Sequence, residues 1–227
     1  MNPIAVAIDG PSGAGKSTIA RAAARQLGYI YVDTGAMYRT IGLAVQRAGI
    51  AIGEPEKILP LLDGLQVGLS YDEQGMQHVL LNGEDVSGLI RTPEMSMYAS
   101  FVSAVPEVRT FLLETQRSMA RTSSVIMDGR DIGTVILPDA AVKIFLTASA
   151  EARAQRRLLE LQQKGEPVTY DEVLADMIQR DKQDSERATA PLKKAEDAVL
   201  VDTSALTLEQ SIQAVLDCIR QKTEESE

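Results

Sequence analysis

Short apolar runs alternate along the chain with longer amphipathic stretches. Most of the runs are bounded by Gly, Asp, Ser or Pro, and they are rich in Val and Ile, as in strands that are buried on both faces. They cover residues 4–8, 29–32, 124–127, 141–146 and 198–201. Strands separated by helices predict a parallel sheet, so the pattern indicates an α/β fold with a central sheet of about five strands.

Helices are expected between these strands. Capping residues support several starts: Thr92 before Pro93, Thr169 with Glu172, and Thr207 with Gln210. The expected helices cover residues 19–27, 36–48, 54–62, 106–121, 150–164 and 171–187, with two more that start at Thr92 and Thr207.

The pattern changes between the second and third apolar runs. Residues 66–71 and 78–81 alternate apolar and polar side chains, and a polar Asp-Glu-Gln-Gly segment joins them. Alternation around such a turn predicts an antiparallel hairpin. We therefore expect a small antiparallel sheet in an inserted subdomain.

A glycine-rich loop follows the first apolar run and leads into the first helix. It matches the phosphate-binding pattern G-x-x-x-x-G-K-[ST], whose backbone N–H groups can surround a triphosphate at a helix N-terminus. Lys16 can reach the β and γ phosphates, and the Ser17 hydroxyl can bind Mg²⁺. The alternative is a plain strand-to-helix turn. We expect ATP to be held by Gly10, Pro11, Ser12, Gly13, Ala14, Gly15, Lys16, Ser17 and Thr18.

Composition narrows the class of protein. The chain has 227 residues, of which 44% are hydrophobic and 24% charged, as is typical of soluble globular proteins. Its net charge of −9 argues against broad nucleic-acid binding. Cys218 and His78 are single, so neither a disulfide, a zinc site nor a Cys- or His-based mechanism is expected. We expect a cytoplasmic protein that acts on small molecules, without membrane or nucleic-acid partners.

A second anion site is expected near the loop. Ligands of parallel sheets collect beyond the carboxyl ends of the strands. Arg39 follows the second apolar run and Arg130 follows the third, so both are candidate phosphate ligands. Arginine suits this task because its fork of donors matches phosphate oxygens. The alternative is a pair of salt bridges at the strand ends.

Arg180, Asp184 and Arg187 recur at helical spacing and share one face of the long helix from 171 to 187. Such a stripe can bind a polar nucleoside. Taken alone, it is more typical of a solvated face, because the helix is highly charged elsewhere.

On the preceding helix, Arg153, Arg156 and Arg157 could likewise bind a ligand or belong to a solvated face. They lie within about one turn, where like charges repel. A triphosphate between these arginines and the glycine-rich loop would offset that repulsion, and a solvated helix face is again the alternative.

Longer motifs indicate a family. They are IDGPSGAGKST at 8–18, VDTGAMYR at 32–39, GEDVSGLIRTPE at 83–94, DGRDIGTV at 128–135 and RDKQDSERATAPL at 180–192. Many unrelated NTPases share the first motif alone. Together the motifs resemble the bacterial cytidylate kinases, a family of nucleoside monophosphate kinases, over essentially the whole chain.

The resemblance implies an architecture. It is a three-layer α/β/α P-loop core formed by residues 1–35, 100–152 and 170–227, with a monophosphate-binding insert at 36–99 and a short helical lid at 153–169. The predicted hairpin is similar to the small sheet in the enlarged insert of this family. The resemblance also favours a monomer.

The resemblance further implies roles for the matching residues. Arg39, Arg130 and Arg180 would hold the acceptor's α-phosphate near Tyr38, and Asp184 would bind its sugar. Base recognition would fall to Ser100, Arg109, Asp131 and Arg187, while Thr34 stands where related sequences often have serine. Asp128 would reach Mg²⁺ through water, Arg153 would bind ATP, and transfer would depend on Lys16, Arg130, Arg156, Arg157 and Arg180.

The expected reaction is phosphoryl transfer from ATP to CMP and dCMP, which gives ADP and the diphosphate. Direct in-line transfer needs no covalent intermediate, because the acceptor phosphate is already an anionic nucleophile. Two alternatives remain. One is another small P-loop kinase that acts on UMP, AMP or a small alcohol, and the other is a nucleotide-dependent switch that hydrolyses ATP slowly.

Overall fold

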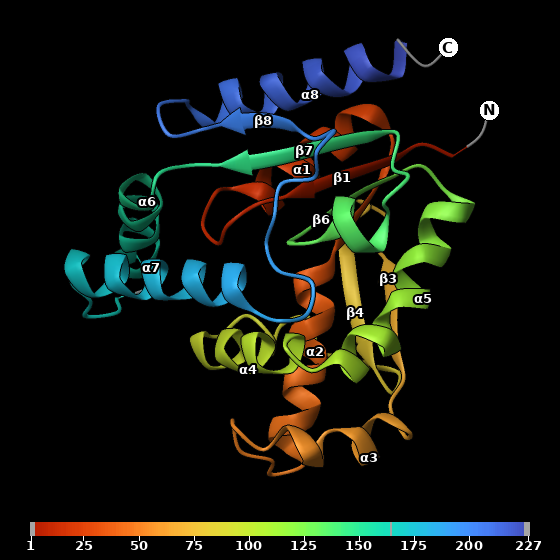
Figure 1. Cartoon of the computed structure of the whole chain (residues 1–227), viewed down its shortest axis with the longest axis vertical. Coiled ribbons are helices and arrows are strands. Elements are labelled where there is room, and N and C mark those ends of the chain that lie inside the picture. Colours follow the sequence, from red (N-terminus) through yellow and green to blue (C-terminus); the bar gives the residue numbers. More distant parts are fainter. Residues whose placement is uncertain (1–2, 164, 225–227) are drawn as a thin grey trace. The chain divides into compact units, whose positions relative to one another are not determined.

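A computed structural model of the chain describes residues 3–163 and 165–224 (Figure 1). The backbone divides into two units. We call Ile30–Val125 the middle unit, and Ile4–Tyr29 with Ile126–Glu227 the terminal unit.

Parallel strands form the centre of the terminal unit. β1 (Ala5–Asp9) pairs with β7 (Val142–Thr147), which in turn pairs with β8 (Val199–Asp202). β6 (Val125–Gly129) is buried along its whole length. With β2 (Ile30–Asp33), these strands form a five-stranded parallel sheet in the order β2-β6-β1-β7-β8. The predicted α/β fold is therefore confirmed.

Helices cover the strands of the terminal unit (Figure 1). α1 (Lys16–Leu27) buries small side chains such as Ala20 and Ala23 and packs against β1 and α8 (Leu208–Glu224). α6 (Ala150–Gln163) and α7 (Tyr170–Glu186) lie side by side. Between them is a core of Ala154, Leu158, Leu161, Val173 and Met177.

The predicted caps of α7 and α8 are confirmed. Thr169 and Glu172 form a reciprocal capping box at the start of α7. At the start of α8, the Thr207 hydroxyl accepts from the Gln210 N–H, and the Gln210 side chain accepts from the Thr207 N–H. Lys164, the last residue of the helix predicted at 150–164, lies outside the described residues.

α2 (Thr34–Arg47) is the central helix of the middle unit. It packs against α4 (Pro93–Ser103) and α5 (Pro106–Thr122). It also contacts β3 (Val67–Tyr71) and β4 (Gln77–Leu81), whose antiparallel pairing confirms the predicted hairpin. β5 (Glu84–Asp85) adds a short third strand that the sequence pattern did not predict.

The helix predicted over residues 54–62 is wrong as a single element. The segment forms a 3₁₀ turn, η1 (Pro55–Lys57), and one turn of helix, α3 (Leu59–Leu62). Pro60 has no N–H to continue a hydrogen-bond ladder from the preceding turn, and its ring disfavours the helical conformation at Leu59. Apolar spacing suggested a longer helix because Ile58 and Leu62 are both buried.

Candidate active site

The glycine-rich loop joins β1 to α1, and its path depends on glycine. A Cβ on Gly10 would lie 1.9 Å from the Leu146 carbonyl oxygen of β7, so no larger residue fits there. Gly15, at φ +86°, caps α1 without a side-chain hydrogen bond. The loop therefore presents the N-terminus of α1 without a side-chain cap, the arrangement that favours an anion.

Lys16 is buried at the first position of α1. Its Nζ donates to the Pro11 carbonyl oxygen at 2.7 Å, within the loop itself. Burial, followed by the positive charge of Arg130, lowers its pKa to about 7 against the opposing effects of Asp128, Asp184 and Asp9. A buried ammonium of this kind would gain a strong partner if a phosphate group came within its reach.

Ser17, the residue after Lys16 on α1, faces Asp128 of β6. The Ser17 hydroxyl donates to Asp128 Oδ2 at 2.9 Å, and Asp128 is buried. Mg²⁺ prefers one or two protein oxygens together with phosphate oxygens and water. The pair therefore fits a magnesium site. The described residues contain no group of three or more His, Cys, Asp or Glu that could hold a metal by itself.

Asp9 is a buried carboxylate for which the sequence motifs predicted no role. It accepts the N–H groups of Ile132 and Gly133 at 2.7 and 2.8 Å, and so caps the π-helical turn η2 (Ile132–Ile136) that follows β6. Burial raises its pKa to about 6, although these N–H groups lower it. Asp9 anchors the segment that carries Arg130 and Asp131. The only sequence signal was a charged residue at the end of an apolar strand.

One network in the terminal unit joins Arg130, Asp131, Arg180, Asp184 and Arg187. Arg130 Nε donates to Asp184 Oδ2 at 2.8 Å, and Arg187 contacts Asp131 Oδ1 at 3.4 Å. Burial acts to raise the pKa of Asp184, but Arg130, Arg180 and Arg187 outweigh it and the pKa is lowered. The solvated-face alternative for this stripe is therefore wrong, because Asp184 is buried and paired with Arg130 from the segment after β6.

The three arginines of α6 do not act as one cluster. Arg153 is buried and contacts Asp181 and the Ser12 carbonyl oxygen, while Arg156 donates to the Thr203 carbonyl oxygen at 2.6 Å. Arg157 pairs with Glu160 one turn along. Each guanidinium thus has a partner in the protein, and a triphosphate is not required to offset their repulsion.

The predicted residues of the middle unit also gather around α2, which carries Thr34, Tyr38 and Arg39. Arg39 donates to Asp33 at 3.0 Å, which is the strand-end salt bridge that the sequence left open. Asp33 also accepts from the Ala36 N–H, and its own N–H donates to Gln77.

Arg109 lies on α5 within the same unit. Its guanidinium lies over the Tyr38 ring, 5.5 Å from the centroid, and donates to the Ser103 carbonyl oxygen. Ser100 lies on α4, in the turn of helix that ends at Ser103.

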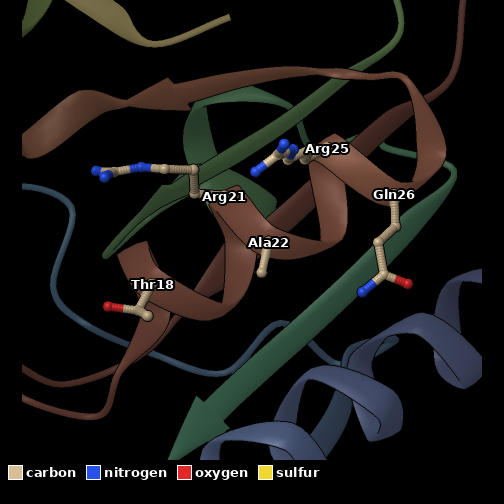
Figure 2. A pocket seen from close by; sticks show the side chains of 5 residues that line it. All are labelled: Thr18, Arg21, Ala22, Arg25 and Gln26. Carbon is tan, nitrogen blue, oxygen red and sulfur yellow. The ribbon is translucent and has the colours of Figure 1, made fainter. Parts of the chain in front are cut away.

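A hollow of about 420 Å³ lies on α1 (Figure 2). Thr18 at the end of the loop motif contributes to it, but Lys16, Ser17 and Asp128 do not. Its lining is Thr18, Arg21, Ala22, Arg25 and Gln26, all from one helix face.

His78 and Cys218, for which no catalytic or metal-binding role was expected, lie on β4 and α8. His78, on β4, contacts Asp85 at 2.7 Å and Asp72 at 3.5 Å. Cys218 is half-buried on α8, and burial raises the pKa of its thiol. None of the helices described here is long and apolar enough to cross a membrane.

Comparison with known proteins gives close relatives. The cytidylate kinase family matches residues 6–221. A cytidylate kinase of Caldicellulosiruptor saccharolyticus is 54% identical over 217 residues, which cover 96% of each chain. One of Citrifermentans bemidjiense is 49% identical over 221 residues, or 97% of this chain and 94% of that one.

A similar solved structure supports the fold and says nothing about function. It is that of an uncharacterized protein from Eubacterium ventriosum, which aligns with a TM-score of 0.54 at 12% identity over 96% of this chain and 98% of the other.

Proposed function

Because the chain belongs to the cytidylate kinase family, we propose that it transfers the γ-phosphoryl group of ATP to CMP and dCMP, which yields ADP and CDP or dCDP. The observation that carries the proposal is the buried Lys16 of the glycine-rich loop motif, whose Nζ donates to the Pro11 carbonyl oxygen of the same loop at 2.7 Å.

On the donor side, the loop from Gly10 to Thr18 holds the phosphates of ATP. Its backbone N–H groups and the N-terminus of α1 face the anion, and Lys16 Nζ exchanges its bond to the Pro11 carbonyl oxygen for phosphate oxygens. Ser17, and Asp128 through water, would hold Mg²⁺, which would supply positive charge next to the phosphates. Arg156 and Arg157 of α6 would approach the transferred group after giving up their present partners.

On the acceptor side, residues are assigned by resemblance, one at a time. In the terminal unit, Arg130 and Arg180 bind the α-phosphate, Asp184 the sugar, and Asp131 with Arg187 the base. In the middle unit, Arg39 and Tyr38 serve the phosphate, and Thr34, Ser100 and Arg109 serve the nucleoside. The burial of Asp184, Asp131 and Arg109 supports these assignments, because buried charges cluster at functional sites.

The reaction needs charge and alignment rather than a general base. Two anions repel each other, so Lys16 and the arginines supply the positive charge that brings the acceptor oxygen into line with the γ-phosphorus. Water is a competing acceptor. We propose that residues 153–169 close as a lid over an α/β core, with residues 36–99 as the acceptor-binding insert.

The test is an acceptor screen with ATP and Mg²⁺. Release of ADP is measured with CMP, dCMP, UMP, AMP and shikimate at equal concentrations. We expect CMP and dCMP to give the highest kcat/KM. Faster transfer to UMP, AMP or shikimate would identify a different small kinase, and slow ATP hydrolysis that no acceptor accelerates would identify a nucleotide switch.

A further inference from the structure

Arg153 occupies a junction between the glycine-rich loop and α7. Its Nε donates to the Ala148 carbonyl oxygen at 2.9 Å, and Nη1 donates to the Ser12 carbonyl oxygen at 2.9 Å. Both terminal nitrogens also contact the Asp181 carboxylate, at 3.1 and 2.5 Å. A guanidinium has five N–H donors, and these contacts use four of them. Arg153 therefore binds protein groups rather than offering its fork to a ligand.

Asp181 lies on the face of α7 that also meets the loop and the arginine network. Met177, Asp181 and Asp184 are spaced at i, i+4 and i+7, so they share that face. A Cβ on Gly13 would lie 2.9 Å from Met177 Cε, which places the loop in direct contact with α7. Asp184, one turn beyond Asp181, holds Arg130. One helix thus touches both the donor loop and an acceptor arginine.

We propose that Asp181, acting through Arg153, is a positioning residue for phosphoryl transfer. The bidentate contact aims the Arg153 guanidinium at the Ser12 carbonyl oxygen and thereby sets the loop against α7. This inference rests on the proposed function, since it assigns the loop to the donor and α7 to the acceptor.

The expected consequence is a loss in the chemical step. In-line transfer requires near-contact geometry, and a displacement of about 1 Å lowers the rate about 100-fold. Base and sugar contacts lie on other residues, so the affinity for CMP should change little. A purely structural role for Asp181 would instead lower stability and leave the kcat of the folded enzyme unchanged.

The experiment compares Asp181→Asn with Asp176→Asn, an exposed aspartate on the same helix. The amide keeps the size of Asp181 but loses its charge and one acceptor. We expect kcat to fall about 10- to 100-fold in Asp181→Asn, with KM for CMP within about threefold of the wild type. Asp176→Asn should match the wild type. Circular dichroism at the assay temperature reports the folded fraction used to normalise kcat.

A double-variant cycle tests whether Asp181 acts through Arg153. The variant Arg153→Gln/Asp181→Asn should be no slower than Arg153→Gln alone, because the path is already broken. A kcat of Asp181→Asn within about twofold of the wild type, or effects of the two substitutions that multiply, would overturn the inference. If the wild type itself gives no transfer to CMP, the proposed function fails instead, so the two failures are distinguishable.

Discussion

The two units place their charged side chains differently. In the terminal unit, Arg153 and Asp184 each bind a partner of opposite charge while their side chains are only 4% and 9% exposed. In the middle unit, Arg47 and Glu84 form a bidentate pair at the surface, with 42% and 52% of their side chains exposed. Burying an ion pair carries a desolvation cost that a surface pair avoids.

Two charged side chains of the middle unit depart from this pattern. Asp33 and Arg109 are buried, and they contact Arg39 and Tyr38, which are predicted acceptor residues. In both units, therefore, most of the buried charges belong to the proposed site or contact it, although Arg157, also a proposed site residue, pairs with Glu160 at the surface. Burial of charge, more than charge itself, marks the positions where substitution should change activity.

The largest effect should come from Lys16, the buried lysine of the glycine-rich loop motif. Lys16→Ala removes the ammonium that, in the proposed function, would bind the transferred phosphoryl group, and we expect kcat/KM for transfer to CMP to fall by at least about 10²–10³-fold, with the fold retained. The measurement is coupled ADP release with thermal melting of the same sample.

The matched control for Lys16→Ala is Lys57→Ala in the middle unit, where the lysine pairs with Glu54 at the surface. It should leave kcat unchanged. Near-normal turnover of Lys16→Ala, or a comparable loss in Lys57→Ala, would break the distinction between the units.

The second-largest effect should come from substitution of the buried carboxylate Asp184. Asp184→Ala leaves Arg130 without its 2.8 Å partner, so we expect the free energy of unfolding to fall by about 3 kcal/mol. KM for CMP should rise more than KM for ATP. Steady-state kinetics with each nucleotide varied, and urea unfolding, measure the two effects. A selective loss of ATP affinity would move α7 to the donor side of the site.

A smaller effect follows from the lowered pKa of Lys16. In the free protein this pKa is about 7, and a bound triphosphate must raise it because the anion favours the ammonium form. Binding above pH 7 therefore takes up a proton, and affinity falls as pH rises, by at most about tenfold per pH unit. Calorimetry of a non-hydrolysable ATP analogue at pH 8, in buffers of different ionisation enthalpy, detects the uptake. Lys16→Ala should show none, and equal uptake in both proteins would assign the proton elsewhere.

The sequence predicted the features that depend on residues close together in the chain, but not the contacts between residues far apart in it. The glycine-rich loop and the Thr169 capping box could be predicted because each depends on residues close in sequence. The partners of Arg153 were not, since Ser12 and Asp181 are brought to it only by the packing of α6, α7 and the loop. Spacing indicated which arginines were candidates for binding phosphate. It could not tell which would bind protein groups.

The smallest effect should come from the exposed histidine of the middle unit. The hydrogen bond to Asp85 raises the pKa of His78, and Asp72 adds to the rise. A raised pKa means that the folded state holds its proton more tightly than the unfolded state. The stabilisation is therefore complete below about pH 6.5 and is lost as pH rises through the raised value.

His78→Gln removes this dependence without changing activity, because His78 lies outside the proposed site. We expect the melting temperature of the wild type to exceed that of the variant by no more than about 2 °C at pH 5.5, and the difference to shrink by pH 8.5. Salt should reduce it further, since exposed charges are screened. A difference that grows with pH would reverse the assigned sign. A loss of kcat in the variant would show that a charge outside the proposed site influences the rate of phosphoryl transfer.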